Sequence, residues 1–278
     1  MKLLVCIKQV PASESKIKMG KEVTEIDPSD LTYVVNPYDE YGVEEAIRIK
    51  ERLGSVDITV LSAGPAKAAD ALRMALAMGA DRAVLLNDPL FSNSDSLGIA
   101  RIIAAYVRMT PFDLIFFGKQ AIDDDMGAVG IMVADLLRLP HGAVVNRLEI
   151  SPDQKSMIVH RQIEGANEIL EILLPAVITC QKGLNEPRYP SLPGIMKAKS
   201  KPLAEIDHEG LRLDPKTVGL SAALVKVVKL FPPQTRTTGK IIEGPPAEAV
   251  KELVQHLSEA TGLAGAERGV RGPSEPPS

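Results

Sequence analysis

The chain has 278 residues, of which 45% are hydrophobic and 24% are charged, a balance typical of a globular protein with a packed core. Its formal net charge of -4 argues against a nucleic-acid-binding protein, because neutralising phosphates requires an excess of lysine and arginine. The only two cysteines, Cys6 and Cys180, are too few for a four-cysteine iron–sulfur cluster or zinc site, so any redox centre must be an organic cofactor or belong to a partner.

The first half of the chain alternates short apolar runs with amphipathic segments, which predicts βαβ units and a Rossmann-like parallel sheet covered by helices. The strand-like runs are residues 2–7, 56–62, 82–86 and 113–117. The helical patterns between them lie within residues 43–53, 72–79 and 99–106. Asn36 is predicted to cap the first helix, since Pro37 suits the first helical position, and Asp95 is predicted to cap the third.

The pattern changes after about residue 142, where two strand-like segments around a Ser-Pro-Asp turn predict an added β-hairpin. Residues 183–202 contain too many prolines and glycines for one regular element. Residues 203–261 predict an extended C-terminal arm that ends in a short amphipathic helix at 248–260. Residues 262–278 have the composition of a disordered tail.

The N-terminal segment MKLLVCIKQV is too short an apolar run for a signal peptide. No other apolar run approaches the roughly 20 residues that span a membrane. We therefore expect a soluble, cytoplasmic protein.

The strongest candidate for a ligand site is the segment Gly118 to Asp125, which follows a predicted strand and leads into a predicted helix. Open α/β sheets bind ligands at this edge, and a helix N-terminus offers free N–H groups and a partial positive charge, so a phosphate could lie against residues 126–129. Two alternatives stay open. The acidic residues could only cap the helix, or Asp123 to Asp125 could hold Mg²⁺ in a nucleotide hydrolase.

Three further segments end near the same edge of the predicted sheet. Cys6 to Val10 follows the first strand, Asn36 to Asp39 begins the first helix, and Ser62 to Pro65 forms a tight turn after the second strand. Taken singly they are weak signals, because a charge such as Lys8 is ordinarily solvated and an aromatic such as Tyr38 ordinarily packs.

The segment after Gly183 combines apolar side chains with a basic flank, which suits docking onto another protein. The alternative is an ordinary packed loop with a solvated lysine flank.

Together these segments resemble the electron transfer flavoprotein beta-subunit family, over nearly the whole chain up to about residue 257. The motifs that carry the resemblance are VCIKQVP, VNPYDEYGVEEAIRIKE, SAGPAKAADALRMALAMGADRAVLL, FFGKQAIDDD and LNEPRYPSLPGIMKAKSK. The resemblance implies a nucleotide-binding domain over residues 1–182, a partner-recognition loop over 183–202, and an arm and helix over 203–261 that pack on an alpha subunit.

The resemblance also implies a function. The family forms heterodimers with a larger alpha subunit whose FAD is reached by both chains, and they shuttle electrons between flavin dehydrogenases, such as acyl-CoA dehydrogenases, and a membrane-bound quinone oxidoreductase or another acceptor. The flavin carries the chemistry, so no catalytic residue is expected from this chain. The beta subunit holds a second adenine nucleotide, which is AMP in the usual members and FAD in electron-bifurcating ones.

Residue by residue, the resemblance implies a cofactor site and a docking loop. The cofactor-binding positions are Cys6, Asn36, Pro37, Tyr38, Asp39, Ala63, Asp95, Ser96, Gly118, Lys119, Gln120, Ala121, Ile122, Asp123, Asp124, Asp125, Met126, Gly127, Ala128 and Val129, with Tyr38 near the alpha-subunit flavin. The partner-binding positions are Leu184, Pro187, Tyr189, Leu192, Ile195 and Met196, with Leu184 as the apolar anchor.

One departure from the family pattern bears on the second nucleotide. AMP-binding members have an Asn-Gln-Thr type sequence where this chain has Gly127, Ala128 and Val129, so only backbone amides could replace the lost side-chain contacts to phosphate. The turn at residues 92–97 loosely resembles the one that bifurcating members place against their second FAD. Both features favour FAD over AMP. The rival hypothesis is a stand-alone protein that binds or hydrolyses an adenine nucleotide.

Overall fold

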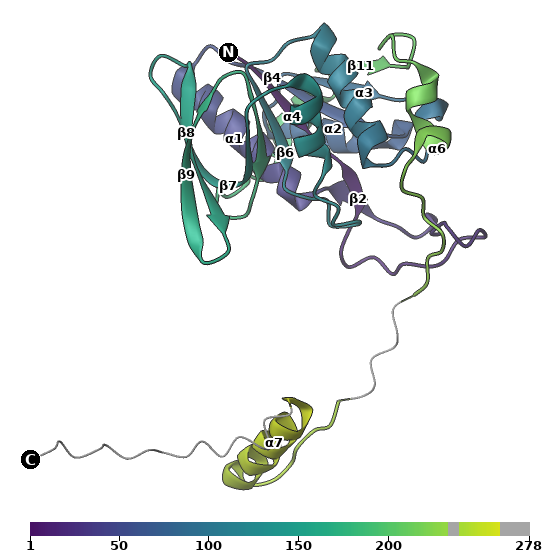
Figure 1. Ribbon diagram of the computed structural model, residues 1–278, viewed down its shortest axis with the longest axis vertical. Helices are drawn as coiled ribbons and strands as arrows, with labels where there is room; N and C mark the ends of the chain where they lie inside the picture. Colours follow the sequence, from purple (N-terminus) through teal and green to yellow (C-terminus); the bar gives the residue numbers. More distant parts are fainter. Residues whose placement is uncertain (233–238, 262–278) are drawn as a thin grey trace, which may run out of the picture. The chain divides into compact units, whose positions relative to one another are not determined.

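The computed structural model describes residues 1–232 and 239–261, and the chain divides into two units, residues 1–232 and 233–278 (Figure 1). The predicted tail, 262–278, lies outside the described residues.

The first unit is built on a nine-stranded sheet. Its strands, in sheet order, are β11 (Leu203–Ile206), β5 (Arg82–Leu86), β4 (Asp57–Ala63), β1 (Lys2–Cys6), β6 (Leu114–Gly118), β10 (Ala176–Cys180), β7 (His141–Ile150), β8 (Ser156–Ile163) and β9 (Ala166–Leu173). All neighbours from β11 to β7 are parallel, and β7, β8 and β9 are antiparallel. A separate two-stranded sheet pairs β2 (Gln9–Pro11) with β3 (Tyr33–Val35).

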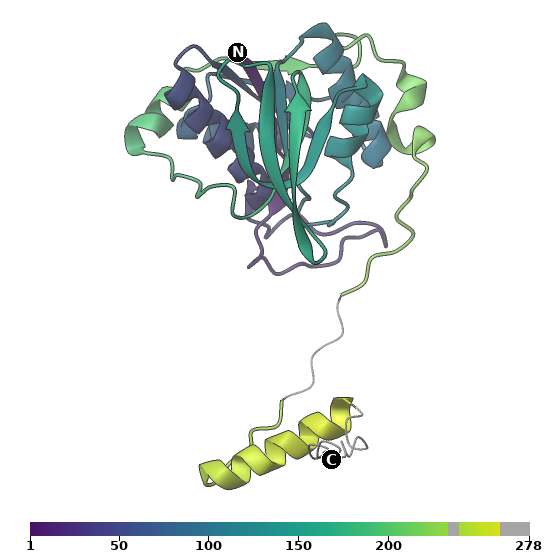
Figure 2. The same cartoon turned by 60° about the vertical axis from the view of Figure 1, so that its left-hand side comes forward.

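Helices cover both faces of the sheet, with one pair in purple and blue on one side and another pair in blue and teal on the other (Figure 2). The helices are α1 (Pro37–Leu53), α2 (Ala69–Met78), α3 (Ser96–Met109), α4 (Val129–Leu137), α5 (Leu192–Ala198), α6 (Gly219–Ala222) and α7 (Pro246–Thr261), with short 3-10 helices η1 (Ala66–Ala68), η2 (Pro89–Phe91) and η3 (Pro215–Thr217). None of the described helices combines the length and apolar character that crossing a bilayer requires.

Strand periodicity divides the interior into two cores. In β1, Leu3 and Val5 join α1 and α2 in one core, whereas Leu4 and Cys6 join α3 and α4 in the other. This division follows from the alternation of side chains along a strand. Because both faces are covered, the central strands are apolar at nearly every position.

The order of the strands creates a crevice at the centre of the sheet. After β1 the chain continues into the helices of one face, and after β6 it continues into α4 on the opposite face. The loops that follow these two neighbouring strands therefore diverge, and in open α/β sheets ligands bind at such a point.

The predicted architecture is confirmed: the four predicted strands are parallel, the three helices lie between them, and the added hairpin is antiparallel. The sequence also predicts β structure at residues 176–180, which is β10, but not its parallel place between β6 and β7. Two elements were not predicted. β11 pairs with β5 at the sheet edge although it lies within the predicted arm, and α5 forms inside the proline-rich segment. The helix of the second unit, predicted at 248–260, is α7.

Candidate functional site

A cavity of about 300 Å³ lies at the carboxyl ends of β1, β4 and β6, between the first turns of α3 and α4. The predicted cofactor positions that line it are Cys6, Asn36, Asp39, Ala63, Asp95, Ser96, Gly118, Lys119, Gln120, Ala121, Asp124, Met126, Gly127, Ala128 and Val129. The structure thus brings together residues from five separate stretches of the chain.

Eight further residues line the cavity. Three of them lie in segments that the sequence singled out without naming them as cofactor positions: Ile7, Lys8 and Ser94. The other five were not predicted: Leu61, Ile99, Ile103, Phe117 and Gly130. Ile99 and Ile103 are four residues apart on α3, so their shared face was visible in the helical pattern. The pattern does not reveal that this face also borders a cavity, because that depends on how α3 lies against β4 and β6.

Five predicted cofactor positions do not line the cavity: Pro37, Tyr38, Ile122, Asp123 and Asp125. The Lys119 ammonium lies 5.0 Å from the centre of the Tyr38 ring, so this ring contacts a residue that does line the cavity. Asp125 accepts a hydrogen bond from Gln120 Nε2 at 2.5 Å. Among residues 1–232 and 239–261, no group of three or more His, Cys, Asp or Glu side chains is arranged to hold a metal ion.

Asn36 connects the start of α1 to the loop after β6. The prediction that its side chain caps α1 is wrong, because no such hydrogen bond forms. Instead Asn36 Nδ2 donates to the Gln120 carbonyl at 2.9 Å, and Asn36 Oδ1 accepts from the Ile122 N–H at 3.1 Å. A buried amide needs both a donor and an acceptor partner, and the loop supplies both. Pro37 occupies the first turn of α1 as predicted.

Asp39 joins β1 to β6 at the point where their loops diverge. Its carboxylate accepts from the Lys8 N–H at 2.7 Å and from the Gly118 N–H at 2.9 Å. Burial raises the pKa of Asp39 to about 7, although these two N–H groups partly offset that effect. Gly118 is required here, because a Cβ at this position would lie 2.3 Å from Asp39 Oδ1.

Lys8 is not the solvated charge that the sequence indicated. Its ammonium donates to Asp123 Oδ1 at 2.8 Å and to Asp124 Oδ2 at 2.9 Å, and its side chain is 43% exposed. Partial burial lowers the pKa of Lys8, but the hydrogen bonds and charges of the two carboxylates outweigh burial and raise it.

The start of α4 supplies backbone N–H groups at the cavity. Ala128 is the N-cap residue, and its side chain makes no hydrogen bond to the first N–H groups of the helix. Gly127 has a φ of 60°, in the left-handed region that favours glycine, and a Cβ there would lie 3.2 Å from the Lys119 carbonyl oxygen. The chain therefore enters α4 without a bulky side chain between the helix end and the cavity.

The start of α3 is occupied differently. Asp95 Oδ1 accepts from the Gly98 N–H at 2.9 Å, which confirms the predicted cap, and Asp95 Oδ2 accepts from the Leu224 N–H at 2.8 Å. Burial raises the pKa of Asp95, but these backbone donors outweigh it and lower the pKa. Asp95 thus holds residues 224–225 beside the cavity as well as capping α3.

The predicted docking loop presents most of its apolar side chains to solvent. Tyr189 is 95% exposed, Leu192 is 79% exposed and Met196 is 66% exposed. Ile195 is also exposed, whereas Pro187 is partly buried and lines a groove beside α1 and α2. Leu184, the predicted anchor, is partly buried and packs against the core of α1 and α2.

An ion-pair network that the sequence did not reveal holds this loop on α1. The Arg188 guanidinium bonds Glu44 at 2.8 and 3.1 Å and Glu51 at 2.6 and 3.0 Å. Asn185 Nδ2 adds bonds to the Tyr41 carbonyl and to Glu45. The loop backbone is therefore fixed while its apolar side chains remain exposed.

The fold and the cavity define a Rossmann-like α/β protein with a ligand-sized crevice at the switch point of its sheet. A family model described as the electron transfer flavoprotein domain matches residues 23–210. The chain belongs to the electron transfer flavoprotein family, on the side of its beta subunits.

Curated relatives match over nearly their full length. The chain is 41% identical over 262 residues to the electron transfer flavoprotein subunit beta of Bacillus subtilis, which covers 94% of this chain and 99% of that protein. It is 38% identical over 264 residues to the caffeyl-CoA reductase-Etf complex subunit CarD of Acetobacterium woodii, covering 93% and 98%. It is 33% identical over 267 residues to the acryloyl-CoA reductase electron transfer subunit gamma of Anaerotignum propionicum, covering 93% and 98%.

Proposed function

We propose that this chain is the beta subunit of a two-subunit electron transfer flavoprotein and that its cavity holds an AMP moiety, either as AMP itself or as the AMP half of FAD. The observation that carries the proposal is the start of α4, which has no side-chain cap from Ala128 and borders a cavity that is also lined by the apolar side chains of Leu61, Ile103 and Phe117.

The lining matches the chemistry of an AMP moiety. The side chains of Leu61, Ile103 and Phe117 offer apolar surface to a flat adenine ring. The N–H groups at the start of α4, together with the positive end of its dipole, offer donors to a phosphate. The volume lies at the lower end of the roughly 300–1,000 Å³ common for small-molecule sites, so the second half of FAD would extend beyond the cavity.

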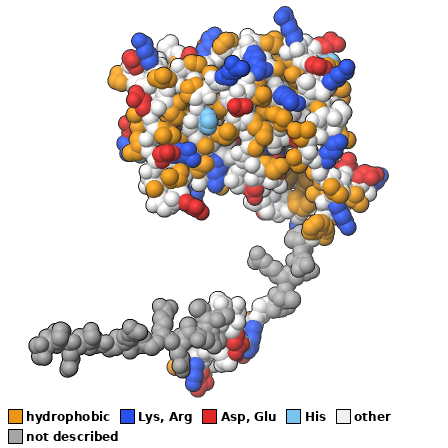
Figure 3. Space-filling model, in the orientation of Figure 1, with side chains coloured by type: hydrophobic (Ala, Val, Ile, Leu, Met, Phe, Trp, Pro, Cys, Tyr) orange, Lys and Arg blue, Asp and Glu red, His pale blue; other side chains and the backbone are white. Residues whose placement is uncertain are grey.

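A bound flavin supplies the electron-carrying chemistry, and the residues of this chain position the groups around it. We infer that Tyr38, which contacts Lys119 but does not line the cavity, faces the flavin of the alpha subunit. Charges of both signs are interspersed on the face shown in Figure 3, as expected for a chain with a net charge of -4.

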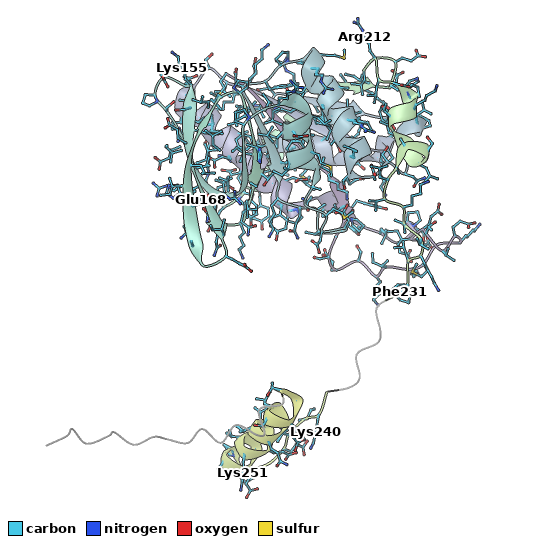
Figure 4. The ribbon with its side chains drawn as sticks, viewed as in Figure 1. Lys155, Glu168, Arg212, Phe231, Lys240 and Lys251 are labelled. Atoms are coloured by element: carbon cyan, nitrogen blue, oxygen red, sulfur yellow. The ribbon has the colours of Figure 1, made fainter. Side chains whose placement is uncertain are left out.

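The helix of the second unit supports an alpha-subunit partner. Its side chains Val250, Leu253, Val254 and Leu257 follow the i, i+3, i+4, i+7 spacing of one helical face, and each is between 47% and 58% exposed. Lys251 lies on the same helix outside that spacing (Figure 4). A helix with such an apolar stripe ordinarily packs against another element, and we assign that element to the alpha subunit.

The loop around α5 supports docking of an electron-donating dehydrogenase such as an acyl-CoA dehydrogenase. Because Leu184 packs inward and Leu192 is exposed, we assign the anchor role to Leu192. An exposed apolar side chain on a fixed backbone binds a partner without a large loss of conformational entropy. The acceptor, which the resemblance places at a membrane-bound quinone oxidoreductase, would then be served by the same flavin.

The test is to co-express the chain with an alpha subunit, purify the complex, and separate the released nucleotides by HPLC. We expect flavin absorbance and two nucleotides per complex. FAD with AMP would identify AMP in this chain, and two FAD would support the sequence features that favour FAD and bifurcation. A colourless monomer that hydrolyses ATP would refute the proposal in favour of a stand-alone nucleotide hydrolase.

A further inference from the structure

Lys8 occupies a position that the proposed function does not explain. It follows β1, and its ammonium lies between Asp123 and Asp124, which belong to the loop of residues 119–126 that forms one wall of the cavity. The two ends of this contact are 115 and 116 residues apart in the sequence. Lys8 is therefore a bridge from the sheet to this loop.

The bridge continues to the start of α4. The two carboxylate oxygens of Asp124 have different partners. Oδ2 accepts a hydrogen bond from Lys8, and Oδ1 accepts one from the Met126 N–H at 3.0 Å. Met126 directly precedes Gly127, where the chain turns into α4. A displacement of Lys8 would therefore be transmitted through one carboxylate to the backbone that begins α4.

Lys8 is itself fixed from behind, since Asp39 accepts a hydrogen bond from its backbone N–H. Asn36 holds the first part of the loop through Gln120 and Ile122, and Lys8 holds the second part. Within residues 1–232 and 239–261, Lys8 is the only charged side chain outside the loop that hydrogen-bonds to it.

Direct binding of a phosphate by Lys8 is disfavoured by the same contacts. Its positive charge is already matched by two carboxylates, and a phosphate brought to the ammonium would lie beside both of them. The lysine is thus placed to orient the wall of the cavity rather than to contact an anion.

We propose that Lys8 is a positioning residue that acts through Asp123 and Asp124 to hold the loop and the start of α4 in the geometry that receives the nucleotide. This inference rests on the proposed function of the cavity. In this inference Asp123 and Asp124 accept hydrogen bonds from Lys8 instead of binding a metal ion.

The experiment uses the full chain in complex with its alpha subunit, with the second nucleotide removed, and measures AMP binding by calorimetry. Lys8→Met should weaken AMP binding about fivefold, the equivalent of about 1 kcal/mol for a partly exposed ion pair. Lys8→Arg should retain most of the affinity. The double variant Asp123→Asn/Asp124→Asn should weaken binding like Lys8→Met, and adding Lys8→Met to it should cost little more.

The double variant separates positioning from direct contact by the sign of its effect. If Lys8 touched the phosphate, neutralising two carboxylates would free its charge and tighten AMP binding. Asp125→Asn is the control for loss of charge, since it removes one negative charge from the same loop but this carboxylate bonds Gln120 and not Lys8. We expect its AMP affinity to stay within about twofold of the wild type.

Each outcome bears on one claim. A wild-type complex that binds no AMP overturns the proposed function. A wild-type complex that binds AMP, together with an unchanged affinity in Lys8→Met or a tighter affinity in the double asparagine variant, overturns the inference alone. A lower melting temperature in Lys8→Met with unchanged AMP affinity would show a merely structural ion pair. If Lys8→Met fails to fold, the asparagine variants remove the same contacts from the loop side.

Discussion

Arg188 offers the sharpest test of how the predicted docking loop is held on α1. Its guanidinium makes paired hydrogen bonds to Glu44 and to Glu51, and the Glu44 side chain is only 3% exposed. Replacing Arg188 with Met keeps the apolar stem and removes the charge, which leaves Glu44 with Arg48 as its remaining ion-pair partner at 2.8 Å.

The expected loss of stability follows from the burial of each partner. Removing one side of a fully buried pair typically costs about 3–5 kcal/mol, but Arg48 still neutralises part of the Glu44 charge. Glu51 is 57% exposed, so its share is at most about 1 kcal/mol. We expect Arg188→Met to lower the free energy of unfolding by about 2–3 kcal/mol near neutral pH.

The pH dependence of stability is a second, independent measure of the Arg188–Glu44 contact. Burial raises the pKa of Glu44, but the hydrogen bonds from Arg188 and Arg48 outweigh it and hold the pKa below its ordinary 4.5. A carboxyl group with a lowered pKa in the folded state contributes stability above its ordinary pKa and loses it as the pH falls through the folded value. The difference between wild type and Arg188→Met should therefore shrink as the pH falls below 4.5.

Urea denaturation at pH 7 and at a series of acidic pH values measures both effects. Arg147→Met is the control, because Arg147 and its partner Glu149 are both more than half exposed. This variant should lower the free energy of unfolding by less than about 0.5 kcal/mol. The reasoning is refuted if Arg188→Met costs no more than the control at pH 7, or if its cost is the same at every pH.

Three further predictions concern the cavity and the loop. Burial raises the pKa of Asp39 to about 7, so the charged form is disfavoured in the folded protein. The free energy of unfolding of the wild type should therefore fall as the pH rises from 4 towards 7, by about 4 kcal/mol at most. Urea titration of Asp39→Asn should show no such fall. Gly118→Ala would place a Cβ 2.3 Å from Asp39 Oδ1 and 2.7 Å from Tyr38 Cβ. Thermal unfolding should show a loss of stability of at least about 2 kcal/mol, and HPLC should show less bound nucleotide. Wild-type values in both measurements would contradict the geometry. Leu192→Ala should raise the KM for the dehydrogenase roughly tenfold at unchanged nucleotide content, whereas Leu184→Ala should chiefly lower the melting temperature; the reverse pattern would return the anchor to Leu184.

The parts of this protein that sequence reasoning predicted are those whose energetics are local. The strands that contain Leu4 and Phe116 are short apolar runs flanked by helical patterns, and their burial on both faces follows from that alone. The cap of α3 by Asp95 spans three residues. The edge of the sheet at which the cavity lies was predicted for a similar reason: the segment after β6 lies between a strand pattern and a helix pattern that are adjacent in the sequence.

Other features could not be predicted because they join residues that only the topology brings together. Asn36 has the residue type and position of a helix cap, yet it bonds a loop 84 and 86 residues away. Arg188 reaches Glu44 across 144 residues. β11, within a segment that reads as an extended arm, becomes an edge strand because β5 offers free backbone groups there.

The class of fold, the edge of the sheet at which the cavity lies, and the apolar character of residues 183–202 follow from the sequence alone, since strand period, helix caps and composition act over a few residues. The partners of the charged and amide side chains around the cavity follow from the tertiary structure. Lys8 changes from a solvated lysine to a bridge because parallel strands bring the ends of β1 and β6 side by side, and that adjacency depends on the packing of the whole sheet.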